Sequence, residues 1–279
     1  MATLYIIATP IGNLGDITFR ALEILKGVDL VACEDTRQTL KLLNHYQISK
    51  PLVSYFQHSK LSKIEYIAGQ LAEGKNIALV TDAGTPGISD PGGKLVRELS
   101  SLFPERSIAE SKGGGSANFY PSTSSGNKNL PLKIVPIPGP NAAIAALSVS
   151  GFPTDKFIFM GFPPHKKGRN KFFEEVARAE YVVVFYESTH RILKAMEQLS
   201  SSLRGAERRS NPADGSKDSG LPRVSDARDD KKSERQVVVC RELTKMFESV
   251  YRGTAEEILG RLNEDKNNQK GEFVVIIEK

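Results

Sequence analysis

The sequence predicts an α/β protein made of two α/β domains, and three observations support this fold class. Short apolar runs rich in β-branched residues recur along the chain, and most are followed by apolar residues at helical spacing. Glycine, proline and polar residues gather where these runs end, most densely in the stretch 82–93, DAGTPGISDPGG. The 279 residues, of which 39% are hydrophobic and 25% charged, suffice for two ordinary cores. We expect domains at 1–139 and 140–279, each with a mostly parallel sheet that carries helices on its faces.

The first domain opens with an apolar run that stops at Pro10, and three more runs of this kind follow. The predicted strands are Leu4–Thr9, Leu30–Cys33, Ile77–Val80 and Lys133–Ile137. Between them, apolar residues three and four positions apart predict amphipathic helices, two of which end at Gly27 and Gly74. The predicted helices are Thr18–Lys26, Thr39–Tyr46, Ser59–Glu73 and about Gly93–Leu102.

The second domain starts with an alanine-rich helix, Ala142–Val149, for which Asn141 is the expected N-cap. The predicted strands that follow are Phe157–Phe162, Tyr181–Tyr186, Gln236–Cys240, Phe247–Arg252 and Phe273–Glu278. The predicted helices are Lys171–Arg178, Ile192–Leu199 and one that runs from Thr254 to Leu262. Thr254 with Glu257 three residues later is the pattern of a capping box.

Two irregular stretches interrupt the alternation. Residues from about 104 to 130 contain GGG and SSG without periodicity, so we expect an inserted flexible loop. Residues from about 204 to 235 hold nine basic and seven acidic residues and few large apolar ones, so we expect a disordered charged insert. These stretches supply about +3 of the net charge of +5, so the global charge says little about partners.

Cysteine usage and hydropathy bear on the compartment. The two cysteines, Cys33 and Cys240, each end an apolar strand-like run, and we expect buried structural thiols in a reducing cytoplasm. No apolar run approaches the ~20 residues of a membrane-spanning helix. The start, MATLYIIATPIG, is typical of a first strand and not of a signal peptide. The sequence therefore predicts a cytoplasmic protein outside the membrane.

Several common catalytic and cofactor motifs do not occur in the sequence. The dinucleotide pattern G-x-G-x-x-G after the first strand and the phosphate loop G-x-x-x-x-G-K-[ST] are missing. Four scattered histidines and two distant cysteines have no metal-ligand spacing, so we expect no metal. Ser89 and Ser188 lack the G-x-S-x-G setting of a hydrolase nucleophile.

Polar residues instead follow the ends of several predicted strands. They are Thr9-Pro10, the stretch EDTR at 34–37, Thr81-Asp82, the stretch PGPN at 138–141, Glu187 and Arg241-Glu242. Open α/β sheets bind ligands at the carboxyl ends of their strands. We therefore expect the loop 82–93 to hold a cofactor. The structural alternative is a tight turn that needs glycine for its geometry alone.

Six motifs in order resemble the tetrapyrrole-methylase superfamily, and within it the branch that methylates small-subunit ribosomal RNA. The motifs are TPIGNLGD, CEDTR, VTDAGTPGISDPG, PIPGPNA, FYESTHR and KGEFVV, and the resemblance covers about 3–102, 132–200 and 236–279. It implies two α/β domains with S-adenosylmethionine in the cleft between them. It also implies a homodimer that transfers a methyl group to the 2′-oxygen of a cytidine ribose in the decoding region of 16S rRNA, on the small ribosomal subunit.

The resemblance also implies which residues contact the cofactor. They are Pro10, Asp82, Ala83, Gly84, Thr85, Ile88, Asn141, Ala142, Phe185, Tyr186, Cys240, Gly271 and Glu272.

A ribose hydroxyl is a poor nucleophile until its proton is removed, so the reaction calls for a general base or a strongly orienting acceptor. The candidates are Glu34, Asp35, Glu187 and His190. Helix capping is the alternative role for Glu34 and Asp35, and a plain surface position is the alternative for His190. The sequence does not choose among the four.

The expected RNA contacts are basic. The loop 165–171 holds four lysines and arginines beside Phe172-Phe173, a pattern suited to phosphates and unpaired bases. The predicted RNA-binding residues are Arg37, Lys166, Lys167, Arg169 and Arg191. The alternative is a solvated charged loop, and in either case we expect Phe172 or Phe173 in the core.

Two other functions remain open at this stage. The same fold can methylate a precorrin-type tetrapyrrole or a diphthine-type modified histidine, although CEDTR and FYESTHR favour the ribosomal branch. A non-enzymatic RNA- or ligand-binding module is the third hypothesis.

Overall fold

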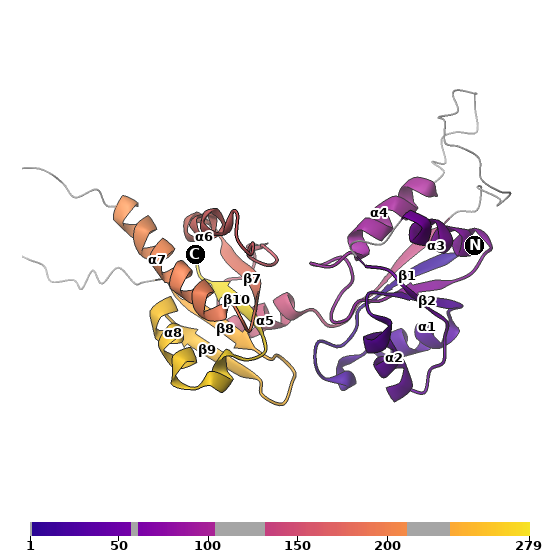
Figure 1. Cartoon of the computed structure of the whole chain (residues 1–279), viewed down its shortest axis with the longest axis horizontal. Helices are drawn as coiled ribbons and strands as arrows, with labels where there is room; N and C mark the ends of the chain where they lie inside the picture. Colours follow the sequence, from indigo (N-terminus) through magenta and orange to yellow (C-terminus); the bar gives the residue numbers. More distant parts are fainter. Residues whose placement is uncertain (1, 57–60, 104–131, 211–234) are drawn as a thin grey trace, which may run out of the picture. The chain divides into compact units, whose positions relative to one another are not determined.

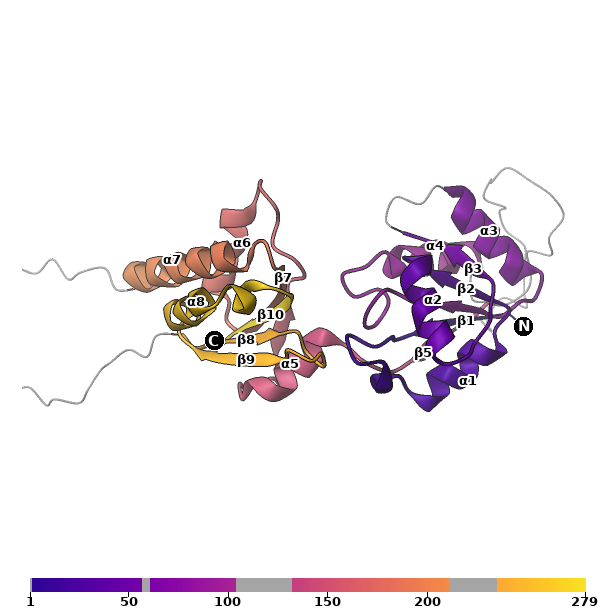
Figure 2. The same ribbon diagram turned by 60° about the horizontal axis from the view of Figure 1, so that its bottom comes forward.

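The computed structural model describes residues 2–56, 61–103, 132–210 and 235–279, and it divides into two compact units (Figures 1 and 2). The first unit is Met1–Asn141 and the second is Ala142–Lys279. The predicted flexible loop at 104–130 lies outside the described residues, as does most of the predicted disordered insert at 204–235.

The first unit is built on a five-stranded sheet whose order is β3-β2-β4-β1-β5. Its strands are β1 (Thr3–Ile7), β2 (Leu30–Cys33), β3 (Leu52–Ser54), β4 (Ile77–Leu79) and β5 (Lys133–Ile137). All four neighbouring pairs run parallel, which confirms the predicted parallel sheet for this half of the chain.

Helices cover both faces of this sheet because its central strands are apolar on both sides. Leu30 and Ala32 of β2 pack with α3 (Leu61–Ala72) and α4 (Gly92–Leu102). Val31 and Cys33 of the same strand face the opposite way, toward α1 (Phe19–Gly27) and α2 (Thr36–His45). A strand buried on both faces reads as a continuous apolar run, and this explains why LVAC was recognisable in the sequence. A short 3₁₀ turn, η1 (Leu14–Asp16), precedes α1.

The second unit has a five-stranded sheet of order β6-β7-β10-β8-β9. Its strands are β6 (Phe157–Phe159), β7 (Val182–Ser188), β8 (Val237–Arg241), β9 (Ser249–Gly253) and β10 (Glu272–Ile277). Only β6 and β7 run parallel, and the other three pairs are antiparallel. The prediction of a mostly parallel sheet is therefore wrong here. The loop 242–248 between β8 and β9 is too short for the crossover that a parallel pair needs.

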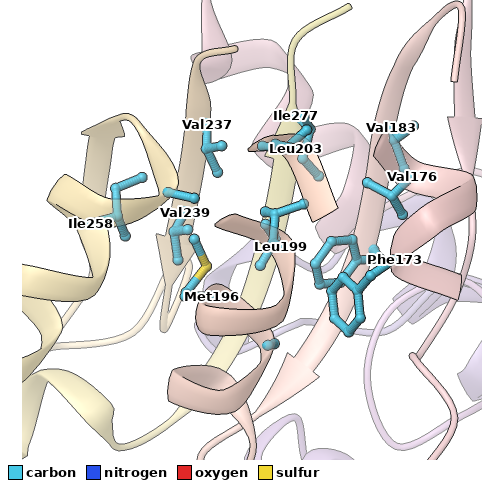
Figure 3. Close-up of a cluster of buried hydrophobic side chains, with 14 of the residues drawn as sticks. Phe173, Val176, Val183, Met196, Leu199, Leu203, Val237, Val239, Ile258 and Ile277 are labelled. Atoms are coloured by element: carbon cyan, nitrogen blue, oxygen red, sulfur yellow. The ribbon is translucent and has the colours of Figure 1, made fainter. Parts of the chain in front are cut away.

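Three helices cover one face of this second sheet. They are α6 (Arg169–Arg178), α7 (Ile192–Ser210) and α8 (Ala255–Glu264), which pack side by side (Figures 1 and 2). Between them and the sheet lies a core in which Phe173, Leu199 and Ile258 meet strand residues such as Val183 and Val239 (Figure 3). Phe172 is also buried, which confirms the core position expected for this aromatic pair.

The opposite face carries the helix α5 (Ala142–Ser150), whose Ala143, Ala146 and Leu147 pack on Val274 and Ile276 of β10. The capping box of α8 is present as predicted, with Thr254 and Glu257 bonded to each other's backbone N–H. The helix α7 runs to Ser210, past its predicted end at Leu199 and into the stretch expected to be disordered. A 3₁₀ turn, η2 (Lys266–Gln269), connects α8 to β10. Of the helices in the described part of the chain, none has the length and apolarity to cross a membrane.

Candidate functional site

The loop after β4 folds back onto the end of β1. The backbone N–H of Thr9 donates to the Gly84 carbonyl at 2.9 Å, and the N–H of Gly84 donates to the Thr9 carbonyl at 3.0 Å. The Thr9 hydroxyl also donates to the Thr81 carbonyl at 3.0 Å. Gly84 has a φ of +85°, in the left-handed region that favours glycine. The backbone conformation at this position therefore requires glycine. The hydrogen bonds with Thr9 place Gly84 next to the segment that carries Pro10.

The same loop meets the segment that follows β5. The Thr85 hydroxyl donates to the Pro140 carbonyl at 3.0 Å. Gly139 lies so close to the residue after β1 that an added Cβ would stand 2.9 Å from the Ala8 Cβ, so a larger residue would push these two segments apart. Three stretches predicted to contact the cofactor thus lie together at the carboxyl ends of the strands of the first sheet. They are Pro10 after β1, residues 82–85 after β4 and Asn141 after β5.

Asp90 shapes the far half of the loop. Its carboxylate accepts the backbone N–H of Gly87 at 2.8 Å and that of Gly92 at 2.6 Å. Asp90 therefore closes the loop just before α4, and the chain in between exposes Ile88 and Ser89 to solvent.

Asp35 is an N-cap held by a neighbouring arginine. Its carboxylate accepts the Arg37 backbone N–H at 2.8 Å and pairs with the Arg37 guanidinium at 2.6 Å. These hydrogen bonds from Arg37 lower the pKa of Asp35 to about 2. The alternative role foreseen for Asp35, helix capping, is the one that its contacts show. Its backbone N–H also donates to Asp82 at 3.0 Å and so joins the ends of β2 and β4.

Glu34 sits in a different environment one residue earlier. It is half-buried, and one of its oxygens accepts the Thr81 hydroxyl at 3.0 Å. Burial raises the pKa of Glu34 above the ordinary glutamate range, and the nearby carboxylates of Asp82, Asp90 and Asp35 add to the increase. No role was predicted for Thr81 from the sequence. The feature that could have indicated one is its hydroxyl, which directly precedes Asp82 after β4.

Glu187 lies in the interior of the second unit and not at its surface. One carboxylate oxygen accepts Arg169 at 3.0 Å and the other accepts Arg191 at 2.9 Å, and the Glu187 side chain is completely buried. The Arg169 side chain is only 5% exposed and pairs inward, which argues against the predicted contact of this residue with RNA. Burial equally argues against Glu187 as a base that meets substrate, since both oxygens are occupied.

Three predicted cofactor residues share the α5 face of the second sheet. Val274 of β10 stands between Tyr186 and Cys240 in the strand register, and Ala142 packs against the same cluster. The Tyr186 hydroxyl accepts the N–H of Ala143 at 3.2 Å. Burial raises the pKa of Cys240 to about 11, so this residue is a neutral thiol near pH 7. Cys33 and Cys240 are both buried and free, as expected.

Phe185 points away from those three residues. Successive side chains of a strand alternate between faces, and the Phe185 ring is buried in the core under α6 and α7. Any contact that Phe185 makes with a cofactor on the α5 face is therefore made by its backbone.

Gly271 and Glu272 begin β10 beside other predicted site residues. Gly271 has a φ of +108°, and its N–H donates to the Thr189 hydroxyl at 2.7 Å. Glu272 pairs with Lys245 at 2.8 Å. His190 is exposed next to Thr189, at the start of α7.

Among the other predicted RNA contacts, Arg191 is only 17% exposed and pairs with Glu187, whereas Lys166, Lys167 and Arg37 are exposed. Lys166 and Lys167 lie on the surface loop before α6. The Arg37 side chain is 86% exposed although it pairs with Asp35.

Comparison with known proteins identifies what this arrangement resembles. The family model of tetrapyrrole (corrin/porphyrin) methylases matches residues 3–108 and 125–259. The ribosomal RNA small subunit methyltransferase I of Escherichia coli O157:H7 is 38% identical over 276 residues, which are 99% of this chain and 77% of that protein. The protein of the same name from Synechocystis sp. is 38% identical over 278 residues, covering 99% and 79%.

Solved structures add a likeness of fold alone. The structure of a cobalt precorrin-4 methyltransferase of cobalamin biosynthesis aligns with a TM-score of 0.57 and 15% sequence identity. It covers 99% of this chain and 94% of that one.

Proposed function

Because the chain belongs to the tetrapyrrole methylase family, in the branch of the ribosomal RNA small subunit methyltransferases I, we propose that it methylates the 2′-oxygen of a cytidine ribose in 16S rRNA with S-adenosylmethionine as donor. The observation that carries this proposal is the 38% identity over 99% of the chain. Precorrin methyltransferases share the fold at only 15% identity, which gives the tetrapyrrole substrate much weaker support.

The edge of the first unit has the chemistry that S-adenosylmethionine requires. When bound, this cofactor supplies an electrophilic methyl group on a positively charged sulfur. The Asp82 carboxylate and the exposed backbone around Ala83 offer partners for cationic and polar groups, and the half-exposed Ile88 offers apolar surface. Gly84 and Thr85, pinned to the ends of β1 and β5, hold this surface in place.

The second unit has residues of its own that suit contact with the cofactor. Tyr186 and Ala142 are partly exposed next to the buried thiol of Cys240, and they offer apolar surface suited to excluding water from a reacting methyl group. Gly271 and Glu272 add a backbone in an unusual conformation and a carboxylate. We propose that the loop at 82–88 contacts the donor and, as a separate proposal for the second unit, that these residues do so as well.

Among the four candidate bases, Glu34 has the most suitable environment. Asp35 is held ionised by Arg37, and Glu187 is enclosed by two arginines. Glu34 has one oxygen oriented by Thr81 and a raised pKa, which brings a carboxylate closer to the range of an effective base. We propose that Glu34 accepts the proton of the 2′-hydroxyl.

Two further properties belong to the proposal. A homodimer is supported by the outer side of α5, where Ile144 and Val149 are 53% and 43% exposed on an almost wholly apolar helix. A cytoplasmic location is supported by two free buried cysteines and by a substrate that belongs to the ribosome.

The direct test is a methylation assay on small ribosomal subunits that lack the modification. The protein is incubated with these subunits and methyl-labelled S-adenosylmethionine, and the RNA is digested to nucleosides. We expect the label in 2′-O-methylcytidine from 16S rRNA. Label in a base, in a precorrin offered in parallel, or in no product would contradict the proposal.

The assignment of Asp82 is tested with a matched pair of variants. Asp82→Asn should weaken binding of S-adenosylmethionine in calorimetry, because it removes a charge from the predicted site. Glu23→Gln removes the same charge from the exposed face of α1 and should leave the affinity unchanged. Equal affinities for both variants would remove Asp82 from the site.

A further inference from the structure

A charged triad is buried in the second unit. Glu187 lies between Arg169 and Arg191, with its Oε2 atom 3.0 Å from Arg169 and its Oε1 atom 2.9 Å from Arg191. The side chains of the three residues are 0%, 5% and 17% exposed in the same order. Two cations and one anion give the triad a net positive charge. Burial of charge is costly unless every group is paired, and apolar residues could fill the same space. The triad therefore indicates that these three charged side chains do more than fill the core.

Both guanidiniums also reach the backbone of one loop. The Arg191 Nη1 atom donates to the Pro163 carbonyl at 3.1 Å, and the Arg169 Nη1 atom donates to the Pro164 carbonyl at 3.3 Å. Their positions are fixed in turn by Gln198, which accepts Arg169 Nε at 2.7 Å, and by Ser188, which accepts Arg191 Nε at 3.0 Å. Two consecutive carbonyls of the loop are thus tied to a single buried carboxylate.

The loop that is held in this way presents two lysines outward. His165, Lys166 and Lys167 are exposed, and Gly168, with a φ of +88°, turns the chain so that Arg169 can point inward at the start of α6. Within the described part of the chain, neither lysine lies within ion-pair distance of a carboxylate. The loop therefore offers two unneutralised ammonium groups above a buried excess of positive charge, an arrangement that attracts anions.

We propose that Glu187 is a positioning residue for RNA binding, which acts through Arg169 and Arg191 to hold residues 163–168 so that Lys166 and Lys167 meet backbone phosphates of the substrate. This inference rests on the proposed function, which supplies RNA as the polyanion. It assigns to Glu187 neither proton transfer nor a direct contact with the substrate.

A double-mutant cycle tests the coupling. The three variants are Glu187→Gln, the pair Lys166→Ala with Lys167→Ala, and the combination of all three changes. Affinity for small ribosomal subunits is measured over a range of salt concentrations, together with KM, kcat and the affinity for S-adenosylmethionine. We expect the lysine pair to raise KM about tenfold and to reduce the slope of log affinity against log salt by about 1 to 2.

If Glu187 acts through the loop, Glu187→Gln should raise KM and flatten the salt slope in the same direction. The combination should then be little worse than the lysine pair alone, because the effects are not additive. The affinity for S-adenosylmethionine should not change. Additive effects, or a Glu187→Gln variant that loses kcat with an unchanged salt slope, would overturn the proposal.

Two controls separate positioning from folding. Arg178→Gln removes a charge from the exposed end of α6 and should not change KM. If Glu187→Gln does not fold, Arg191→Lys replaces it in the cycle, since lysine keeps the charge but lacks the planar guanidinium whose three nitrogens reach Glu187, Ser188 and Pro163 separately. RNA binding can be measured without turnover, so an inactive wild-type protein would refute the proposed function while the cycle still tests the loop.

Discussion

Three carboxylates and one imidazole were equally plausible bases in the sequence, and their surroundings in the structure distinguish them. Glu34 directly follows the apolar strand β2, Glu187 is the second-last residue of the apolar strand β7, and both precede a helix, so the two look alike in the sequence. The two residues differ in their partners: Arg169 approaches Glu187 from 18 residues earlier in the chain, whereas Thr81 approaches Glu34 from the segment after β4, 47 residues later. Local patterns do not encode such long-range contacts. The positions of the site residues along the strands could be predicted, but their burial and charge state could not.

Glu34→Gln should reduce kcat at least 100-fold if Glu34 is the base, in the range typical of lost general-base catalysis. In the wild type, kcat should fall as the pH drops through the raised pKa of Glu34, because only the carboxylate accepts a proton. A raised pKa also means that ionisation of Glu34 disfavours the folded state, so the variant should be at least as stable as the wild type near pH 7. A pH–rate profile and a thermal melt measure both, and a fully active variant would exclude Glu34.

Gly84→Ala should weaken the binding of S-adenosylmethionine and destabilise the protein by about 1 to 2 kcal/mol. The cause is the backbone conformation, since a φ of +85° is unfavourable for alanine. Steric overlap is not the cause, because the added Cβ would stand 3.5 Å from its nearest neighbour, an ordinary contact distance. Gly260→Ala is the matched control, because this glycine lies in α8 with nothing within 4 Å of an added Cβ. That substitution should stabilise the protein by about 0.5 to 1 kcal/mol without affecting the cofactor. Calorimetry and denaturant unfolding distinguish the two.

At the scale of the element, predictions succeeded where a strand or helix carries its own pattern. The runs LVAC and KIVPI became β2 and β5 with the expected bounds, and the capping box began α8. The strand β3 was not foreseen, because three residues with one buried side chain, Val53, carry no period. The predicted strand direction was wrong in the second unit, because an alternation of strands and helices does not determine whether neighbouring strands run parallel or antiparallel. The predicted end of α7 was too early, because the charged residues of its last turns resemble those of a disordered insert.

Thr254→Ala should destabilise the second unit by about 1 kcal/mol, because it removes the hydroxyl that accepts the Glu257 N–H at the start of α8. Thr254→Ser keeps this hydroxyl and should cost much less. Urea unfolding followed by circular dichroism provides the measurement. Equal losses for the two variants would show that the methyl group and not the cap is what matters.

At the scale of the whole molecule, the two units each have their own hydrophobic cores. Leu95 is buried between the sheet and helices of the first unit, and Phe173 lies in the core of the second (Figure 3). Compact units with separate cores can unfold as separate cooperative steps. The activity itself was predictable at this scale only through the six motifs, because neither composition nor net charge pointed to RNA.

Leu95→Ala and Phe173→Ala test that independence. Each should cost about 2 to 5 kcal/mol through the cavity it leaves, and each should shift the unfolding of its own unit. Hydrogen exchange followed by mass spectrometry reports the two units separately within the intact chain. Equal loss of protection in both units from either change would mean that the chain unfolds as one.

The strand order of the second sheet has a consequence for how the protein is made. In the order β6-β7-β10-β8-β9, the strand at 272–277 fills the gap between β7 and β8, so their inner edges stay unpaired until that segment has been synthesised. In the first unit, by contrast, β5 is added at an edge, and all five strands exist once residue 137 has been made. A nascent chain can therefore finish its first sheet early, while the second keeps two apolar strand edges open to mispairing until residues 272–277 have been made.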